Sequence, residues 1–429
     1  MTSYKAALAA FAPAMKGDQT DRVPLLRQIL ANLGHPDQRF QIVHVAGTNG
    51  KGSTGQIIAE ALLAKGFRVG HFASPALLDE REQVQINQQL ITPAQVVTAV
   101  AQIKAHLPAG VTLGKLTIFE GWTLIALVTF ARQQVDWAVI EVGLGGQLDA
   151  TNAISAPALA VITHLALDHT RILGPTLTAV AHAKAGIIKA GTRAVVLAPE
   201  QAPAARAVIA QAAKQAQVPL VDSATVVQVH PTLAGQVAIQ VGTEPGWQSP
   251  FGLSGQFQRL NLVTALAALR QLPLAWSVAE LQVALGRVRL PGRFEQINAQ
   301  PPVILDGAHN PDGTRHLLAA LQERYPAAQP TFILGFLADK AVATLAQQYQ
   351  ALGATYYLVT PNHPTRALPA EKLKDYLPTG QVMPSVATAL TAALDAAATP
   401  KTVIVITGSF YVVKEGKRLA ATKFYSGNQ

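Results

Sequence analysis

The chain contains no cysteine among its 429 residues. Disulfide bonds, a thiolate nucleophile and a zinc site with cysteine ligands are therefore excluded, and a reducing compartment, the cytoplasm, is the expected location. Any bound metal must take oxygen or nitrogen ligands. Long apolar runs are also lacking, because runs such as residues 122–131 fall short of the roughly 18 to 20 residues that span a bilayer. We expect no membrane segment, and we interpret residues 5–16 as a surface helix rather than a signal peptide.

Charged residues are few, at 14%, and basic ones prevail, so that the formal net charge is +9. The lysines and arginines are scattered and form no run interleaved with aromatic residues, which argues against a nucleic-acid partner. A basic balance suits anionic small molecules, although it equally suits a solvated basic surface. At 49% hydrophobic residues the chain is globular. Its length exceeds the roughly 250 to 300 residues of a single core, so we expect two domains.

The recurring pattern is a short β-branched run, a glycine turn and a helical stretch, which is typical of a parallel α/β fold. Alternating valines at residues 225–242 predict instead a pair of antiparallel strands. Turn-rich residues 291–302 are the best linker, so we expect domains at 1–292 and 293–429. The predicted parallel strands are residues 41–45, 136–142, 159–163, 194–197, 303–305, 331–334, 355–359 and 403–407.

A glycine-rich turn between a strand and a helix is the strongest motif in the chain. It directs backbone N–H groups and the positive end of a helix at a phosphate, while Lys51 reaches phosphate oxygens and the Ser53 hydroxyl remains for Mg²⁺. The strict G-x-x-x-x-G-K-[ST] spacing is not met, and a glycine turn without a ligand is the alternative. We therefore predict an ATP site in a P-loop-type, doubly wound domain, followed by a smaller Rossmann-like α/β domain. The residues of the loop are Gly47, Thr48, Asn49, Gly50, Lys51, Gly52 and Ser53.

This short loop resembles that of the folylpolyglutamate synthases, particularly the lactobacillus-type enzymes, and of the related Mur ligases. The resemblance continues over most of the chain, in the same order and with similar spacing. It is carried by residues 73–75 (Ala-Ser-Pro), 140–146 (Ile-Glu-Val-Gly-Leu-Gly-Gly), 149–152 (Asp-Ala-Thr-Asn), 167–169 (Leu-Asp-His), 184–189 (Lys-Ala-Gly-Ile-Ile-Lys), 306–311 (Asp-Gly-Ala-His-Asn-Pro), 339–340 (Asp-Lys) and 407–409 (Thr-Gly-Ser).

The resemblance implies an ATP- and Mg²⁺-dependent ligase that adds L-glutamate to the γ-carboxylate of a reduced folate through an acyl phosphate. Dihydrofolate synthase, alone or combined with this activity, shares the same motifs and stays open. A Mur ligase is disfavoured because its loop usually carries Thr where Gly52 stands. A GTP switch would need an N-K-x-D motif after the loop, and a translocase would need helicase motifs. Neither occurs. The family further implies a cytoplasmic monomer.

Candidate metal ligands follow from position and from the resemblance. Glu141 ends an apolar strand, as a metal-binding acid beside a phosphate loop does, although such a residue is more often a cap. By resemblance, Ser74, Glu141 and His169 hold Mg²⁺, with Ser53 as a further ligand. Lys184 corresponds to a lysine that the family carbamylates, a reaction that requires a neutral amine. Lys51, Lys184 and His309 are the expected catalytic residues, and His309 is only a candidate base.

The resemblance also assigns substrate contacts. Asn261, Arg293 and Asp306 are expected at ATP, and His309 and Ser409 at glutamate or the reacting centre. Phe119 and Glu120, at the start of a helix, and Ser74 are expected near the folate. A place in the hydrophobic core is an equal alternative for Phe119. An ion pair is the structural alternative for Arg293. The sequence departs from the family pattern at Ala46, Ala73, Gln83, Gln88 and Gln147, which affects the folate side rather than the ATP side.

Overall fold

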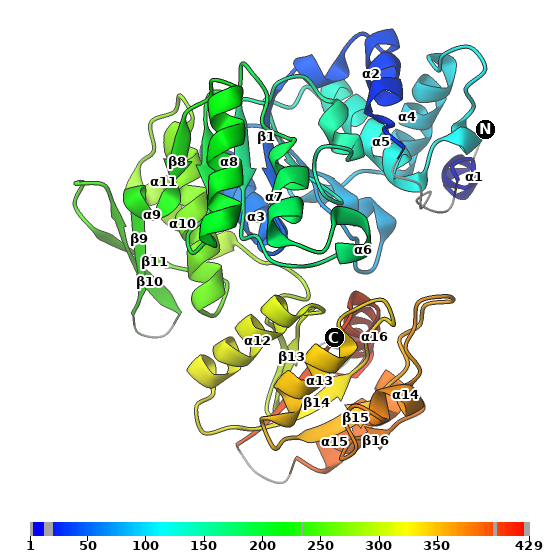
Figure 1. Cartoon of the computed structure of the whole chain (residues 1–429), viewed down its shortest axis with the longest axis vertical. Helices are drawn as coiled ribbons and strands as arrows, with labels where there is room; N and C mark the ends of the chain where they lie inside the picture. Colours follow the sequence, from blue (N-terminus) through cyan, green and yellow to red (C-terminus); the bar gives the residue numbers. More distant parts are fainter. Residues whose placement is uncertain (1–2, 13–19, 233–234, 398–400, 424–429) are drawn as a thin grey trace. The chain divides into compact units, whose positions relative to one another are not determined.

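The computed structural model describes residues 3–12, 20–232, 235–397 and 401–423. The chain divides into two compact units (Figure 1). Unit 1 consists of residues 1–252 and 259–288, and unit 2 consists of residues 253–258 and 289–429. The first domain predicted from the sequence, residues 1–292, includes residues 253–258 and 289–292, which belong to unit 2. No helix within the described ranges is long and apolar enough to cross a membrane.

Unit 1 contains an eight-stranded sheet with the order β4-β3-β2-β5-β1-β6-β7-β8. Four of its strands were predicted, namely β1 (Gln41–Ala46), β5 (Trp137–Glu141), β6 (Leu159–Ile162) and β7 (Val195–Leu197). Pairing is parallel from β2 to β8, whereas β3 is antiparallel to both of its neighbours. The strands that were not predicted are β2 (Val69–Phe72), β3 (Val84–Ile86), β4 (Gln89–Leu90) and β8 (Leu220–Asp222).

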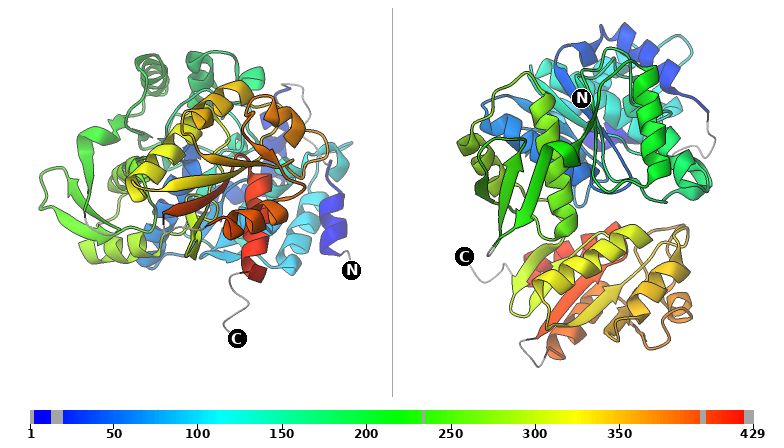
Figure 2. Two further views of the ribbon diagram at one scale, coloured as in Figure 1. Left: turned by 90° about the horizontal axis from the view of Figure 1, so that it is seen from below. Right: turned by 60° about the vertical axis from the view of Figure 1, so that its left-hand side comes forward.

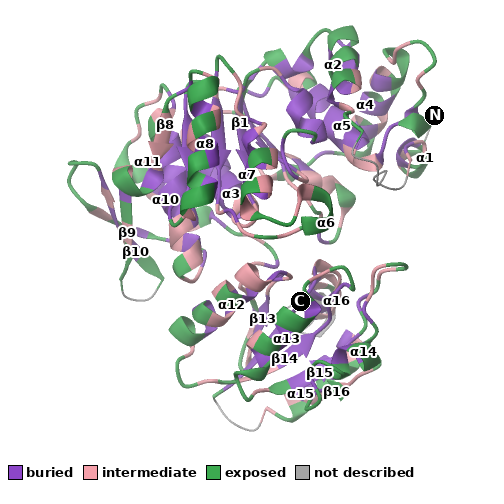
Figure 3. Ribbon diagram, viewed as in Figure 1, coloured by how far each residue is buried: buried purple, intermediate pink, exposed green. Residues whose placement is uncertain are grey.

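Helices cover this sheet, and α5 (Ile118–Arg132) is buried from Glu120 to Phe130, as its purple ribbon in Figure 3 shows. Trp122 and Phe130 of α5 belong to the main core of unit 1. The helix expected at residues 5–16 is short, and part of that range lies outside the described residues. The helices are α1 (Tyr4–Ala9), α2 (Val23–Asn32), α3 (Lys51–Ala64), α4 (Pro93–Ala105), α5 (Ile118–Arg132), α6 (Thr170–Leu173), α7 (Leu177–Ala185), α8 (Pro203–Gln215), α9 (Ser223–Val226), α10 (Gln256–Gln271) and α11 (Val278–Arg287).

A separate three-stranded sheet forms part of unit 1, beside α11 (Figures 1 and 2). The predicted antiparallel pair is confirmed as β9 (Val227–Pro231) and β10 (Gln236–Val241), and β11 (Trp247–Pro250) extends it. Val237, Ile239 and Val241 are buried, which explains the alternating pattern of the sequence.

Unit 2 contains a six-stranded sheet with the order β12-β13-β17-β14-β15-β16. All pairs are parallel except β12 with β13. The four strands predicted here are confirmed, and with those of unit 1 they confirm the α/β class. The elements are β12 (Glu295–Ala299), β13 (Pro302–Leu305), α12 (Pro311–Arg324), β14 (Gln329–Leu334), α13 (Val342–Gln350), β15 (Thr355–Leu358), α14 (Ala370–Lys374), β16 (Gln381–Val382), α15 (Val386–Asp395), β17 (Thr402–Thr407) and α16 (Phe410–Lys423).

Parallel strands place the loops that follow them at one edge of the sheet, where α/β proteins bind ligands. In unit 1 the loops after the neighbouring strands β2, β5, β1 and β6 lie at such an edge. In unit 2 the loops after β13, β17, β14 and β15 do the same. Both edges carry residues that the sequence analysis selected.

Candidate functional site

The predicted phosphate loop, residues 47–53, leads from β1 into α3, and two of its positions require glycine. Gly50 precedes α3 with φ at 92°, a left-handed conformation that favours glycine. A Cβ atom on Gly50 would lie 2.2 Å from Asn261 Oδ1, and one on Gly47 would lie 1.8 Å from Thr163 Oγ1. Neither position therefore tolerates a side chain, which lets the backbone of the loop approach a ligand closely.

Hydrogen bonds to the segment after β6 fix the shape of this loop. The Thr48 amide donates to His164 O at 2.9 Å, and the Thr48 hydroxyl donates to Ala166 O at 2.9 Å. Thr163 Oγ1 donates to Asn49 O at 2.8 Å. The loop is thus held from outside, and the first turn of α3 presents the N–H groups of a helix N-terminus, an arrangement that suits an anion.

Lys51 and Glu141 lie side by side at this edge. Lys51 Nζ is 3.8 Å from Glu141 Oε1, and it donates to the carbonyls of Gly47 and Thr48 at 3.2 and 3.3 Å. Glu141 is the last residue of β5 and is 5% exposed. Ser53, in the first turn of α3, is also buried. A carboxylate and a hydroxyl beside a phosphate loop are donors that suit Mg²⁺.

Ser74 and His169 lie on loops of the same edge. Ser74 follows β2, which pairs directly with β5 through Phe72 and Ile140. His169 lies beyond β6, immediately before α6, and is exposed, with its Nε2 3.9 Å from Asp168 Oδ2. The structure therefore brings Lys51 next to Glu141 and places Ser74 and His169 on neighbouring loops.

Lys184, on α7, is buried beneath the phosphate loop. Its Nζ donates a 2.7 Å hydrogen bond to Gly47 O. Burial is the largest of the effects that lower the pKa of Lys184 to about 7; the charge of Lys51 acts in the same direction, and the charges of Asp168, Asp149 and Glu141 oppose it. Near pH 7 a large fraction of the amine is consequently neutral, and a neutral amine is a nucleophile.

The start of α5 forms the next part of the edge. Thr117 and Glu120 make a capping box, in which Glu120 Oε2 accepts the Thr117 amide at 2.7 Å. Arg22 donates to both carboxylate oxygens of Glu120 and to Lys115 O. The Phe119 ring packs against Phe72, with 5.8 Å between centroids, and against Gly143, where a Cβ would lie 2.3 Å from the ring. Arg22 was missed from the sequence.

In unit 2, the four predicted residues lie on three segments: Arg293 precedes β12, Asp306 and His309 follow β13, and Ser409 follows β17. Asp306 accepts the amides of Phe294 and Ala308, both at 2.8 Å. Burial raises the pKa of Asp306, while the charge of Arg293 opposes this shift. The Arg293 guanidinium lies 4.3 Å from the centroid of the Phe410 ring. His309 Nδ1 lies 2.8 Å from Gly307 O, and buried Ser409 precedes α16.

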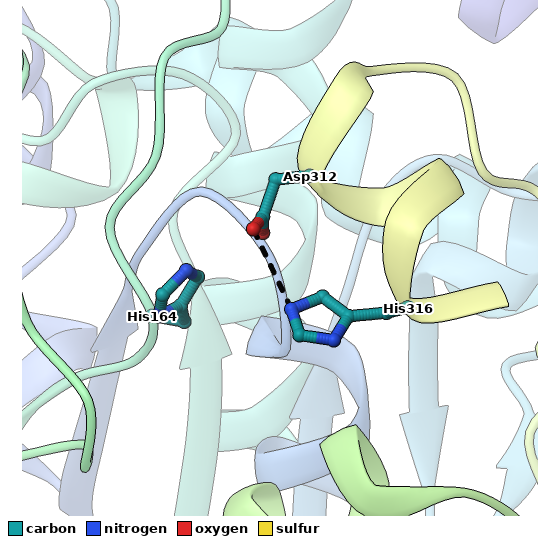
Figure 4. A group of neighbouring side chains, drawn as sticks. All are labelled: His164, Asp312 and His316. Atoms are coloured by element: carbon teal, nitrogen blue, oxygen red, sulfur yellow. Dashed lines mark ion pairs between the residues drawn. The ribbon is translucent and has the colours of Figure 1, made fainter. Parts of the chain in front are cut away.

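Figure 4 shows two further residues of unit 2 that were not predicted. Asp312 and His316, one turn apart on α12, approach within 3.5 Å, an ion pair when the histidine is protonated. The His316 ring stacks on Phe257 at 4.3 Å. His164, drawn in the same view, belongs to unit 1, where its carbonyl accepts the amides of Thr48 and Asn49.

Comparison with known proteins places the chain in a family. Residues 45–269 match the Mur ligase middle domain, and residues 292–410 match the Mur ligase glutamate ligase domain. The chain is 37% identical over 398 residues to the folylpolyglutamate synthase of Lacticaseibacillus casei, which covers 90% of this chain and 91% of the relative. The chain belongs to the folylpolyglutamate synthase family of Mur ligases.

Solved structures of this family have the same fold. Escherichia coli FolC in complex with DHPP and ADP superimposes with a TM-score of 0.87 at 29% identity, covering 98% of both chains. The bifunctional folylpolyglutamate synthase/dihydrofolate synthase of Yersinia pestis, complexed with AMPPNP and Mn ion, gives a TM-score of 0.86 at 30% identity, also over 98% of both chains. A nucleotide and a divalent metal therefore bind to relatives of this fold.

Within this folylpolyglutamate synthase family fold, the predicted residues form two groups. In unit 1 the phosphate loop, Lys51, Glu141 and Lys184 are in direct contact or joined through Gly47, and Asn261 borders Gly50. In unit 2 Arg293, Asp306 and His309 surround Gly307 and Phe410. The roles of these residues stay predictions.

Proposed function

We propose that the protein is an ATP- and Mg²⁺-dependent ligase that joins the amine of L-glutamate to the γ-carboxylate of a reduced folate. The observation that carries this proposal is the group around the carbonyl of Gly47, to which both Lys51 and Lys184 donate while Lys51 also faces Glu141. A phosphate loop bordered by one cationic lysine, one carboxylate and one lysine of lowered pKa suits phosphoryl transfer.

ATP is proposed to bind to the phosphate loop, with Lys51 at the phosphate oxygens and Asn261, Arg293 and Asp306 as further contacts. Ser53, Ser74, Glu141 and His169 would hold Mg²⁺. These hydroxyl, carboxylate and imidazole groups are oxygen and nitrogen donors, as a chain without cysteine requires. The bound ion would neutralise negative charge on the phosphates.

Lys184 is proposed to be carbamylated. Its neutral amine would attack CO₂ to form a carbamate and release one proton, so that a neutral group becomes an anion. The lowered pKa supports this step because an ordinary lysine is almost entirely protonated at pH 7. A carbamate beside Lys51 and Glu141 would orient the groups around the phosphate loop.

The proposed reaction has two steps. An oxygen of the folate γ-carboxylate attacks the γ-phosphorus of ATP, ADP leaves, and an acyl phosphate forms. The glutamate amine then attacks the acyl carbon, inorganic phosphate leaves, and the amine loses a proton, for which His309 is the candidate base. Both steps depend on positioning and charge neutralisation rather than on a protein nucleophile.

The two parts of the chain are proposed to divide these tasks. Residues 1–292 would bind ATP and folate, with Ser74, Phe119 and Glu120 on the folate side. Residues 293–429 would bind glutamate, with His309 and Ser409 near the reacting centre. We expect a monomer in the cytoplasm.

Dihydrofolate synthase activity, alone or in addition, is the second candidate. The structural match to a bifunctional relative from Yersinia pestis favours it. The two activities differ in the acceptor, because dihydropteroate offers a carboxylate without a preceding glutamate.

ADP release by the purified protein distinguishes the candidates. The assay contains ATP, Mg²⁺ and L-glutamate, with tetrahydrofolate monoglutamate or dihydropteroate as the acceptor. Release with the folate alone would establish the chain-extending activity, and release with both would establish a bifunctional enzyme. Release with neither acceptor would refute the proposed function.

A further inference from the structure

A chain of three buried side chains lies beneath the candidate site. His44, in the middle of β1, has its Nε2 2.9 Å from Thr151 Oγ1. Thr151 Oγ1 lies 2.6 Å from Asp149 Oδ1. The side chains are almost inaccessible to solvent, at 0% exposure for His44 and Thr151 and 4% for Asp149. Within the described residues, His44 Nδ1 has no hydrogen-bond partner, so the His44 ring is held through its Nε2 atom.

The protons in this chain can be assigned from its geometry. Asp149 accepts the amides of Thr151 at 3.0 Å and Leu144 at 2.8 Å, so its carboxylate is an acceptor on both oxygens. The single proton of the Thr151 hydroxyl therefore points to Asp149. Since the hydroxyl can then only accept from His44, His44 carries its proton on Nε2. Burial lowers the pKa of His44 well below its ordinary value, so the ring is neutral.

This hydrogen-bonded series ends on the loop at residues 143–152, which begins shortly after the proposed metal ligand Glu141 and packs against the backbone near Lys184. Leu144, whose amide Asp149 accepts, follows Glu141 closely in sequence. Further along this loop, the Gln147 amide donates to Ala183 O at 2.7 Å, and Asn152 Nδ2 donates to Gly186 O at 3.1 Å. A Cβ on Gly146 would lie 3.0 Å from the Lys184 Cα atom. The loop thus packs on the backbone at Lys184.

We propose that His44 and Thr151 are positioning residues, which fix the loop at residues 143–152 and thereby the spacing between Glu141 and Lys184. Neither side chain touches the phosphate loop through its polar atoms, so they act through Asp149 and the loop. This inference rests on the proposed function, which gives Glu141 and Lys184 their roles. The hydrogen bonds among His44, Thr151 and Asp149 are independent of that function.

Two matched pairs of variants test the inference. Thr151→Val removes the hydroxyl at nearly constant volume, whereas Thr151→Ser keeps it. His44→Met removes the donor, whereas His44→Gln keeps an N–H at a similar distance from the backbone. We expect Thr151→Val and His44→Met to lower kcat for ADP release at least tenfold at saturating substrates, and to weaken Mn²⁺ binding in the presence of AMPPNP. Thr151→Ser and His44→Gln should stay within threefold of the natural protein.

Two outcomes would overturn the inference. The first is equal activity and equal Mn²⁺ affinity within each pair. The second is a loss that disappears when each variant is assayed well below its own melting temperature, because this would indicate a role in stability alone. Nitrogen NMR of the natural protein needs no variant. A proton found on His44 Nδ1 would refute the assigned hydrogen bond from His44 to Thr151, and the inference with it.

The same measurements separate this inference from the proposed function. If the natural protein releases no ADP with either acceptor, the proposed function fails. Mn²⁺ binding, measured by electron paramagnetic resonance with AMPPNP, still compares Thr151→Val with Thr151→Ser. A weaker affinity in the valine variant alone would support the inference, and equal affinities would refute it.

Discussion

The side-chain amine of Lys184 donates a 2.7 Å hydrogen bond to the backbone carbonyl of Gly47, the first residue of the phosphate loop. The two residues are far apart in sequence, because Lys184 lies on α7 and Gly47 directly follows β1. The amine is held by a carbonyl rather than by a carboxylate, so burial is the dominant influence on its pKa. This relationship makes the protonation of Lys184 testable.

We predict that Lys184 takes up CO₂ as the pH rises through about 7, the value to which burial lowers its pKa. Below that pH the amine is protonated and cannot attack CO₂. Carbon-13 NMR with labelled bicarbonate should therefore show a carbamate signal at pH 8 that weakens toward pH 6. Lys184→Met should lack the signal, and Lys189→Met should retain it.

The same pKa shift predicts a pH dependence of stability. Between pH 7 and 10.5 the unfolded chain would bind more protons at this residue than the folded chain, because the pKa is lowered on folding. The contribution of Lys184 to the free energy of unfolding should therefore rise with pH over that range. Urea unfolding at several pH values should show this slope in the natural protein and a smaller slope in Lys184→Met. Equal slopes would contradict the assignment.

Gly50→Ala should weaken nucleotide binding more than its backbone strain alone explains. Gly50 and Gly66 have the same φ of 92°, but a Cβ on Gly50 meets Asn261 at 2.2 Å whereas one on Gly66 has nothing within 4 Å. Both alanine variants should lose about 1–2 kcal/mol of stability through strain. Isothermal titration with AMPPNP should show a loss of at least roughly tenfold in affinity, about 1.4 kcal/mol, for Gly50→Ala alone. A similar loss for Gly66→Ala would show that strain, rather than the approach to Asn261, is responsible.

Glu141→Gln should weaken the proposed metal site, because it removes the charge of a buried carboxylate while its shape is nearly kept. Lys51, 3.8 Å away, would then lose an anionic neighbour. We expect ADP release to fall by roughly 100-fold and Mn²⁺ affinity to fall with it. Glu280→Gln is the control, because this carboxylate pairs with Lys65, which directly follows α3, and lies outside the proposed site. Unchanged Mn²⁺ affinity in Glu141→Gln would remove Glu141 from the metal ligands.

The parts of the fold and site that the sequence predicted are those defined by local pattern. The strand, glycine turn and helix around Gly50 are contiguous, and Glu141 stands at the end of an apolar run that became β5. β2 was missed because Gly70 and His71 interrupt its apolar pattern. The structure gives the reason for Gly70, since a Cβ there would lie 2.7 Å from the Phe130 ring.

Contacts between distant segments could not be predicted from local pattern. Arg22 is 98 residues from Glu120, and Lys184 is 137 residues from Gly47. Lys184 was selected only because its surroundings resemble a family motif, and Arg22 stands in no such motif. The contact of His44 could not be predicted for a different reason, because a polar residue within an apolar strand gives no indication of its hydrogen-bond partner. Packing of the 143–152 loop supplies that partner.

The pairing of Arg22 with Glu120 leads to a last prediction, on the folate side. Glu120 receives Arg22 on both oxygens and also caps α5, directly beside Phe119. Arg22→Met would leave a buried carboxylate without its cation, so we expect a loss of about 3–5 kcal/mol in the free energy of unfolding. Arg206→Met is the matched control, because its ion pair with Asp222 is exposed and should change stability by less than about 0.5 kcal/mol.

If Arg22 positions α5 for the folate, Arg22→Met should also raise the KM for the folate while the KM for ATP stays the same. Arg22→Lys keeps the charge but loses the two-pronged geometry, so it should recover stability more than the KM. Urea unfolding and initial rates of ADP release measure the two effects separately. A rise in both KM values, in proportion to the loss of stability, would instead mean that Arg22 supports unit 1 as a whole rather than the start of α5.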